Sequence, residues 1–201
     1  MIIGITGGSG CGKTTALRAV SDLGGLVLDC DEIYHQLLES SPSLLCAISN
    51  RFAGVVTHGK LDRKALGNVV FHDSEALLDL NHIAHGAVLE EVQKRLSHWG
   101  GPLAAIDAIA LFEGGLSPLC QKTVAISAPL ESRVSRLMAR EGISRDYALA
   151  RIGAQKPDSY FRSLCDDTLE NQGTKEEFYQ QALNLFQRYL QSPSSNESIL
   201  L

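Results

Sequence analysis

A glycine-rich run near the N-terminus has the residue types and spacing of a phosphate-binding loop. Residues 7–14 read GGSGCGKT and satisfy the pattern G-x-x-x-x-G-K-[ST]. Glycines let consecutive backbone N–H groups turn towards phosphate oxygens, and the start of a following helix adds positive potential. Lys13 can bridge the β- and γ-phosphates of a nucleoside triphosphate, and Thr14 can hold Mg²⁺. The run therefore predicts a site for a nucleoside triphosphate and Mg²⁺; the alternative is a chance glycine-rich turn.

Cys11 lies inside this loop, and its position allows two interpretations. Lys13 and a helix N-terminus could lower the pKa of the thiol and make Cys11 redox-sensitive. We favour the simpler interpretation, in which a small side chain fits a tight loop. The five cysteines of the chain show no CxxC spacing, so neither a disulfide framework nor a zinc site is indicated, and a reducing cytoplasm fits best.

Two carboxylates, Asp29 and Asp31, close the second apolar run of the chain, in the stretch LDCD. On a strand they share one face, and at the carboxyl end of a parallel strand they face the crevice where α/β sheets bind ligands. A kinase for an alcohol needs a base that orients and deprotonates the hydroxyl, and Asp31 suits that role. Asp29 then serves the metal shell or positions its neighbours. The alternative for Asp31, compatible with the first, is an ordinary helix N-cap.

Two more acids follow a later apolar run. Asp107 ends the stretch LAAID, where a phosphate-loop protein is expected to place an acid near Mg²⁺. Glu113 comes after the expected end of that strand. Two interpretations of Glu113 stay open: a substrate or metal-shell group, and a solvated loop residue.

Three arginines share one face of a predicted helix. Arg133, Arg136 and Arg140 fall at i, i+3 and i+7, and Arg151 and Gln155 follow on the next helix. Arginines that close over a transferring phosphate stabilise its charge, so the two helices predict a lid. We favour this function for Arg140. For Arg133 we favour a place on a solvated basic face, where ion pairs contribute little.

The elements that must position these residues alternate between strand and helix. Apolar runs without alternation are typical of parallel strands buried on both faces, and helical spacing fills the segments between them. Strands are predicted at 1–6, 26–30, 103–109, 123–128 and 167–169, and helices at 13–23, 31–38, 41–51, 62–70, 74–96, 129–140, 144–155 and 175–190. This order predicts an α/β sheet with a mainly helical insertion.

The bulk composition fits one compact globular domain. The chain has 201 residues, 44% of them hydrophobic and 20% charged, with a net charge of −5. That charge argues against nucleic acid or an anionic membrane as the main partner. The longest apolar stretch is too short to span a bilayer, which takes about 20 residues. We expect residues 191–201, which begin with the polar stretch QSPSSN, to form a flexible tail.

Six sequence elements, in order and at similar spacing, resemble the dephospho-coenzyme A kinase family from Ile2 to about Leu190. The family's loop TGGxGxGKS/T corresponds to TGGSGCGKT, and its DAD to DCD. LDRxxL corresponds to LDRKAL at 61–66, and DVPLLFE to DAIALFE at 107–113. The lid sequence RLxxR corresponds to RLMAR at 136–140, and the last element to CDDTLEN at 165–171. The chain departs from the family at Gly86, where a His-Pro pair reads His-Gly, at Ile109 inside DAIALFE, and at Phe161, where a basic residue is common.

The resemblance implies a three-layer P-loop NTPase-type parallel sheet with a helical substrate (CoA) domain and a helical lid. The implied core covers about 1–30, 102–130 and 166–190, the insertion about 31–100 and the lid about 131–160. It implies transfer of the ATP γ-phosphate to the ribose 3′-hydroxyl of dephospho-CoA. We expect a cytoplasmic monomer or weak homo-oligomer, with no nucleic-acid or membrane partner.

The residues that the motifs and the resemblance assign fall into three groups. The catalytic residues are Asp31 as base with Lys13 and Arg140. The nucleotide set is Gly8, Ser9, Gly10, Cys11, Gly12, Lys13, Thr14, Thr15 and Asn171, with Thr14 on the metal and Asn171 near the adenine. The substrate set is Asp29, Asp31, His85, Asp107, Leu111 and Glu113. Two alternatives stay open: a phosphate-loop kinase for another small alcohol or nucleoside, and a nucleotide-binding regulator that has lost activity.

Overall fold

The computed structural model of the chain describes residues 1–191, which form a five-stranded parallel sheet with helices on both faces. The strand order is β2-β5-β1-β6-β7, and each neighbouring pair is parallel. The strands are β1 (Ile2–Thr6), β2 (Leu26–Asp29), β5 (Ala104–Asp107), β6 (Lys122–Ser127) and β7 (Asp167–Glu170). The predicted α/β class with a parallel sheet is therefore confirmed.

Each face of the sheet has its own core. Helices α1 (Lys13–Asp22) and α9 (Lys175–Gln191) pack against each other and cover one face, with Phe178 and Phe186 fully buried there. On β5, Ala105 belongs to this core and its neighbour Ile106 to the opposite one, because successive strand side chains point to opposite faces. The strands are thus buried on both sides, as their unbroken apolar runs predict.

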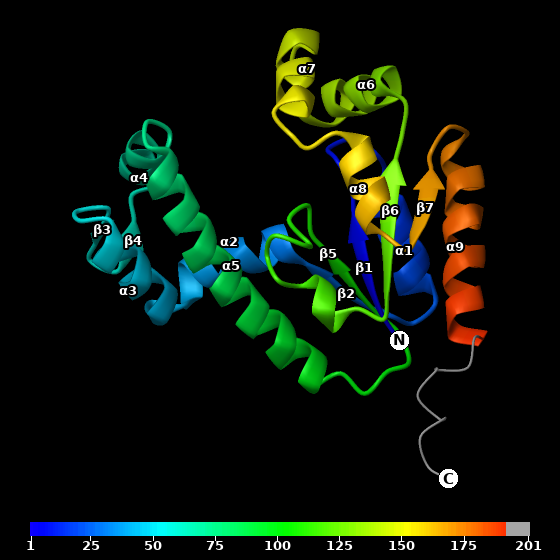
Figure 1. Cartoon of the computed structure of the whole chain (residues 1–201), viewed down its shortest axis with the longest axis horizontal. Helices are drawn as coiled ribbons and strands as arrows, with labels where there is room; N and C mark the ends of the chain where they lie inside the picture. The colour runs from blue at the N-terminus through cyan, green and yellow to red at the C-terminus, as the bar shows by residue number, and fades with distance from the viewer. Residues whose placement is uncertain (192–201) are drawn as a thin grey trace.

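A helical arm follows β2 and extends to one side of the sheet (Figure 1). Its elements are α2 (Cys30–Ser40), α3 (Pro42–Arg51), the hairpin β3 (Val56–Thr57) and β4 (Lys60–Leu61), α4 (Arg63–Val70) and α5 (Ser74–Ser97). Side-chain caps begin each helix, at Asp29, Ser41, Asp62 and Asp73. The arm has an apolar core of its own around Ile48.

Helices α6 (Leu130–Glu141) and α7 (Arg145–Gly153) stand above the carboxyl ends of the strands, and α8 (Asp158–Leu164) lies beside β6 (Figure 1). Gly142 ends α6 with a φ of 66°, a left-handed conformation that glycine adopts without strain. Leu137 of α6 and Ala148 of α7 are fully buried against each other's helix. These helices occupy the region predicted as a lid; the division into core, arm and lid stays a prediction.

Several details differ from the predicted elements. The β3–β4 hairpin, helix α8 and the 3₁₀ turn at Ser117–Leu119 are absent from the predicted list of strands and helices. Asp31 does not lie on a strand, because β2 ends at Asp29 and α2 begins at Cys30. Gln191 ends α9, so the predicted tail lies, apart from that residue, outside the described residues.

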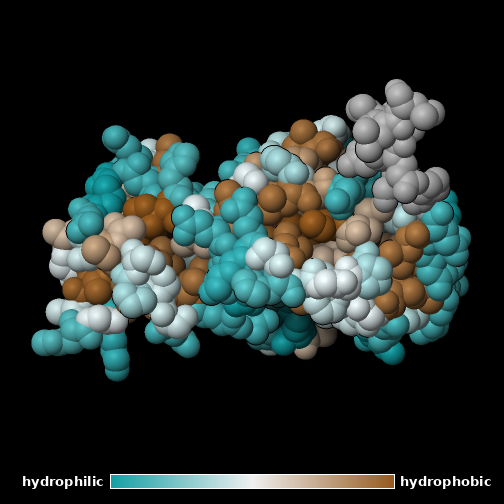
Figure 2. All heavy atoms as spheres, turned by 90° about the horizontal axis from the view of Figure 1, so that it is seen from below, coloured by the Kyte–Doolittle hydropathy of each residue, from teal (hydrophilic) through white to brown (hydrophobic). Residues whose placement is uncertain are grey.

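Hydrophilic and hydrophobic residues intermingle on the face of the molecule seen from below (Figure 2). Within residues 1–191, no helix is both long and apolar enough to cross a membrane.

Candidate active site

The glycine-rich loop runs from the end of β1 into α1, and neighbouring atoms leave no room for a side chain at its glycines. Gly12 has a φ of 107°, and a Cβ there would lie 2.2 Å from Asn171 Nδ2. Gly7 has a φ of 143°, and its Cβ would lie 2.2 Å from the carbonyl oxygen of Ile126. Lys13 donates a hydrogen bond from Nζ to the Gly7 carbonyl oxygen, at 3.0 Å. The lysine is therefore folded back over the loop, where a phosphate chain would lie.

Two buried side chains, Cys11 within the loop and Asn171 beside it, stabilise the loop. Cys11 is 1% exposed, and burial raises the pKa of its thiol despite the neighbouring Lys13. The packing interpretation of Cys11 is thus the one that the structure supports. Asn171 is buried, donates to the Cys11 carbonyl oxygen at 2.9 Å and accepts a hydrogen bond from Arg136 at 3.1 Å.

Asp29 and Asp31, at the end of β2 and the start of α2, make different contacts. Asp29 Oδ1 accepts hydrogen bonds from the backbone N–H groups of Asp31 and Glu32, each at 3.0 Å. Asp29, and not Asp31, is therefore the N-cap of α2, and the alternative interpretation of Asp31 as a cap is wrong. Because Asp29 has taken the backbone donors, Asp31 in the first turn of α2 is exposed with its carboxylate free of the helix backbone.

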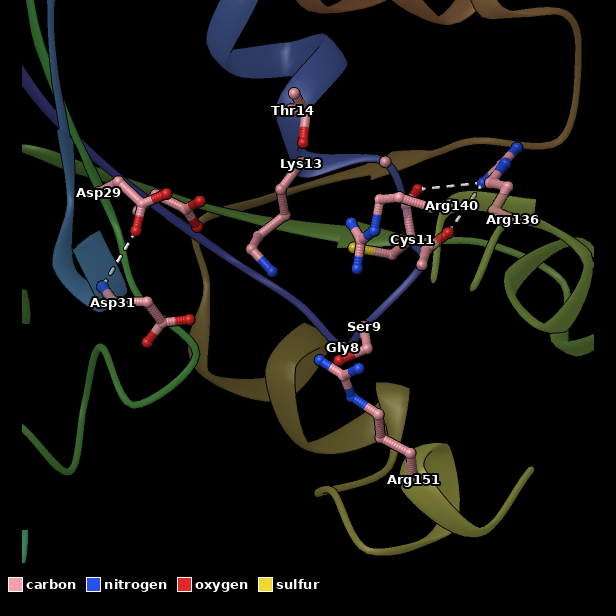
Figure 3. A pocket seen from close by; sticks show the side chains of 13 residues that line it. Gly8, Ser9, Cys11, Lys13, Thr14, Asp29, Asp31, Arg136, Arg140 and Arg151 are labelled. Carbon is pink, nitrogen blue, oxygen red and sulfur yellow. Dashed lines mark hydrogen bonds between the residues drawn. The ribbon is translucent and has the colours of Figure 1, made fainter. Parts of the chain in front are cut away.

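A cavity of about 340 Å³ lies beside the loop, and charged side chains of both signs line it. Figure 3 shows Lys13 at its centre, with Asp29 and Asp31 to one side and the lid arginines to the other. It is lined by Gly8, Ser9, Gly10, Cys11, Gly12, Lys13, Thr14, Asp29, Asp31, Asp107, Arg136, Arg140 and Arg151. Thr15 and Asn171 of the predicted nucleotide set lie outside this lining.

The three arginines of α6 and α7 that line the cavity differ in how they are held. Arg136 donates to the carbonyl oxygens of Gly10 and Cys11, at 3.2 and 3.3 Å. Arg140 and Arg151 are exposed and both pair with Glu141. The hydrogen bond from Arg140 lowers the pKa of that carboxyl. One arginine is thus fixed to the loop, while two are presented to the cavity by a shared carboxylate.

The predicted place of Arg133 on a solvated basic face is wrong. Arg133 is 5% exposed, and its Nε donates to the carbonyl oxygen of Ser9 at 2.9 Å. Its guanidinium also forms an ion pair with Asp158 at 2.8 Å. Gln155 meets the same loop residue twice, accepting from Ser9 N at 2.8 Å and donating to Ser9 Oγ at 2.7 Å. The helical spacing of the arginines predicts a common face but not the partners that bury one of them.

A second cavity, of about 410 Å³, adjoins the first. Asp31 lines both cavities, while His85 and Glu113 line only this second one. It is lined by Cys30, Asp31, Tyr34, Asn81, Ala84, His85, Val88, Ala108, Ile109, Ala110, Glu113, Gly114 and Leu116. Burial lowers the pKa of His85, and the neighbouring Glu113 opposes this shift. The structure therefore brings Asp31, His85 and Glu113 together from three distant segments.

Leu111 stands apart from the rest of the predicted substrate set. Its side chain is fully buried and packs in the sheet core beneath Gly4, whose Cβ would lie 2.7 Å from Leu111 Cδ2. Leu111 lines neither cavity, so its predicted contact with substrate is corrected to a packing role. An apolar residue within an apolar run offers no signal that separates the two roles.

Sequence reasoning did not single out Tyr34, Asn81 or Tyr160. Tyr34 lies one helical turn after Asp31 and lines the second cavity with Asn81. The i, i+3 spacing of Asp31 and Tyr34 could have indicated a shared face. Tyr160 Oη donates to Glu113 Oε1 at 2.8 Å across 47 residues, and no local pattern predicts such a contact.

Asp107 supplies an oxygen suited to a divalent cation. Its Oδ1 is buried without a hydrogen-bond partner among the described residues. Burial raises the pKa of Asp107 to about 6, against the attraction of Lys13 and with repulsion from Asp29 and Asp31. Within residues 1–191, no cluster of three or more His, Cys, Asp or Glu could hold a metal. The carboxylate of Asp107 and the hydroxyl of Thr14, which lines the same cavity, fit Mg²⁺. This ion keeps several waters and binds through few carboxylates and substrate phosphates.

Comparisons with known proteins agree with this geometry. The family model for dephospho-CoA kinase matches residues 1–177. A dephospho-CoA kinase from Carboxydothermus hydrogenoformans is 37% identical over 193 residues, which cover 94% of each chain.

The chain belongs to the dephospho-CoA kinase family.

Two solved structures share the fold of this chain. A crystal structure from Thermus thermophilus is 37% identical with a TM-score of 0.80, covering 94% of this chain and 97% of that one. A shikimate kinase from Acinetobacter baumannii is 19% identical with a TM-score of 0.57, covering 94% and 93%. The second likeness shows the shared fold alone. Both support the predicted three-layer phosphate-loop architecture.

Family membership makes this chain a kinase, and its departures from the dephospho-CoA kinase pattern spare the first cavity. Ile109 lines the second cavity, Gly86 is exposed on α5, and Phe161 is buried in α8. None of the three lines the cavity that holds Lys13 and Arg140.

Proposed function

We propose that this kinase transfers the γ-phosphate of ATP to the ribose 3′-hydroxyl of dephospho-CoA, giving coenzyme A and ADP. The single observation that carries the proposal is the position of Asp31, which lines both the phosphate-loop cavity and the second cavity. A base at their junction can reach an acceptor hydroxyl that points at the nucleotide. We name the first the nucleotide cavity and the second the acceptor cavity.

In the nucleotide cavity, the loop of residues 8–14 wraps the phosphates of ATP with backbone N–H groups. Lys13 leaves the Gly7 carbonyl oxygen and bridges the β- and γ-phosphates. Arg140, which forms an exposed ion pair with Glu141, turns to the oxygens of the moving phosphate. Thr15 and Asn171 support the loop from outside the cavity lining.

In the acceptor cavity, Asp31 accepts the proton of the 3′-hydroxyl as its oxygen attacks the γ-phosphorus. A new O–P bond forms, the bond from the γ-phosphorus to the β,γ-bridging oxygen breaks, and ADP leaves. Asp29 keeps α2 capped and so fixes the position of Asp31. His85 and Glu113 offer polar contacts to dephospho-CoA within an otherwise largely apolar lining.

Thr14 and Asp107 are the residues that would hold Mg²⁺. The ion neutralises charge on the β- and γ-phosphates when it is bound. The support for this assignment is the Asp107 oxygen that has no partner among the described residues. Five free cysteines are compatible with a cytoplasmic setting, and we propose a monomer or weak homo-oligomer without nucleic-acid or membrane partners.

A panel of acceptors tests the proposal. ADP release would be measured by coupled assay with dephospho-CoA, shikimate, gluconate and several nucleosides, each at the same concentration. The proposal expects dephospho-CoA to give the highest kcat/KM by about 10²-fold or more, as expected where a site pairs with many groups of its substrate. Turnover of another alcohol but not of dephospho-CoA would favour the alternative kinase. ATP binding without any turnover would favour the regulator.

A further inference from the structure

One hydrogen bond joins the lid side of the molecule to the wall of the acceptor cavity. Tyr160 Oη, on α8, donates to Glu113 Oε1 at 2.8 Å, and Glu113 lines that cavity. This bond raises the pKa of Tyr160. A hydrogen bond to a carboxylate is stronger than one between neutral groups. The Tyr160–Glu113 bond therefore fixes a charged group of the acceptor site from outside that site.

The helix that carries Tyr160 is anchored to the phosphate loop. Asp158, two residues earlier on α8, pairs with the buried Arg133 at 2.8 Å. Arg133 in turn donates to the Ser9 carbonyl oxygen at 2.9 Å. The ion pair is largely shielded from water, since the Arg133 side chain is 7% exposed and the Asp158 side chain 28%. Polar contacts and two residues of helix thus connect Ser9 in the nucleotide cavity with Glu113 in the acceptor cavity.

Two neighbouring side chains, Phe161 and Lys156, contact the ring of Tyr160. The ring of Phe161 meets it edge-on, with centroids 5.5 Å apart and an interplanar angle of 78°. Lys156 Nζ lies 5.3 Å from the ring centroid on a cation–π contact. Phe161 is 2% exposed and buries the middle of α8 against the rest of the molecule. The hydroxyl of Tyr160 is therefore presented to Glu113 at a position that the helix determines.

We propose that Tyr160 is a positioning residue that couples the two cavities, by holding Glu113 in place whenever α8 is docked on the phosphate loop. Nucleotide that orders the loop also orders Arg133, Asp158 and α8. Glu113 and the other residues that line the acceptor cavity are then already ordered when dephospho-CoA binds. Binding therefore costs the protein less conformational entropy. By linkage, dephospho-CoA strengthens nucleotide binding by the same factor. The inference rests on the proposed function of the two cavities.

The test is the affinity for dephospho-CoA, measured by calorimetry with and without a non-hydrolysable ATP analogue and Mg²⁺. The full chain is expected to bind dephospho-CoA about three- to tenfold more tightly with the analogue present. Tyr160→Phe keeps the ring and its contacts but removes the hydroxyl. It should reduce that ratio to near one and raise the KM for dephospho-CoA, with kcat and the affinity for the analogue alone little changed.

Tyr179→Phe is the matched control. Tyr179 Oη also donates to a carboxylate, Asp22 Oδ2 at 2.7 Å, but neither residue lines a cavity described above. This variant should keep the wild-type ratio. A second variant, Glu113→Ala, completes a double-mutant cycle, in which Tyr160→Phe should change nothing further once Glu113 is absent.

The outcomes separate the inference from the proposed function. A wild-type ratio of one, or an unchanged ratio in Tyr160→Phe, would overturn the coupling even though dephospho-CoA is phosphorylated normally. An effect of Tyr160→Phe that persists in the Glu113→Ala background would overturn it too. Failure of the wild-type chain to phosphorylate dephospho-CoA would instead overturn the proposed function, and the coupling with it.

Discussion

The nucleotide and acceptor cavities are built by different means. The nucleotide cavity is shaped by backbone, because several glycines of its loop have positive φ and neighbouring atoms leave no room for a Cβ at them. Arg133 and Asn171 complete that loop from 124 and 160 residues away. The acceptor cavity is shaped mainly by small and apolar side chains such as Ala108, Ile109 and Val88. The first therefore depends on backbone geometry, whereas the second depends on side-chain volume.

The glycines of the two regions illustrate the difference. A Cβ at Gly12 would lie 2.2 Å from Asn171 Nδ2, whereas a Cβ at Gly86, on the arm helix α5, meets no atom within 4 Å. The chain departs from the family pattern at Gly86 on the arm, at Ile109 in the acceptor cavity and at the buried Phe161 of α8. Four substitutions test the contrast between the two cavities, from the largest expected effect to the smallest.

Lys13→Ala should cause the largest loss of activity, and it should leave binding in the acceptor cavity unchanged. Loss of the ammonium that meets the phosphates should lower kcat by about 10³-fold. The affinity for dephospho-CoA, measured by calorimetry without nucleotide, should stay within about twofold, since Lys13 does not line the acceptor cavity. A comparable loss of acceptor affinity would show that the two cavities are not separable.

Asp31→Asn tests the residue that both cavities share. Removal of the base should lower kcat by about 10²-fold or more, with ATP affinity little changed. Steady-state kinetics and a nucleotide-binding titration provide the two readouts. Near-normal turnover would remove Asp31 from the role of base. A large loss of ATP affinity would assign it to the nucleotide side alone.

Asp107→Asn should change stability in a pH-dependent way. The folded pKa of about 6 exceeds the ordinary value of 3.8, so the folded state binds more protons between these values and its stability falls as pH rises through them. Above pH 6 the ionised carboxylate costs about 2–3 kcal/mol, as a shift of two pKa units implies.

The neutral amide avoids that cost. Urea unfolding without metal or nucleotide should show Asp107→Asn more stable than the wild type at pH 7.5 by about 2–3 kcal/mol. The advantage should decline between pH 6 and pH 4 and disappear below about pH 4. An advantage of the same size at every pH would contradict the assignment to Asp107.

Gly86→Ala should have the smallest effect and the opposite sign from substitution in the loop. An alanine in the middle of exposed helix should stabilise the fold by about 0.5–1 kcal/mol and leave nucleotide affinity unchanged. Thermal and urea unfolding measure the change. Gly12→Ala is the contrasting control, because the φ of 107° and the close Asn171 should make it destabilising. Equal effects at both glycines would break the comparison.

The sequence predicts what local patterns encode. The loop motif, the unbroken apolar strands and the helical stripes predict the parallel sheet and the helical arm. They also predict that Asp29 and Asp31 lie near the carboxyl end of the second strand. Asp29 and Asp31 both suit a helix cap, and only the end of β2 decides between them. The lid arginines show a common helical face, but the burial of Arg133 depends on Asp158, which is 25 residues away.

The remaining misses have the same physical origin. The Tyr160–Glu113 bond and the packing of Leu111 under Gly4 both join segments that only the folded chain brings together. Periodicity reports which side of an element a residue occupies, and it carries no information about what lies opposite.

Identification of the phosphorylated product tests the central claim most directly. The wild-type chain would be incubated with dephospho-CoA and ATP labelled in the γ-phosphate, and the product analysed by mass spectrometry and ³¹P NMR. The account predicts one labelled phosphate on the ribose 3′-oxygen for each ADP formed. Label released as inorganic phosphate, or found on another hydroxyl, would contradict it.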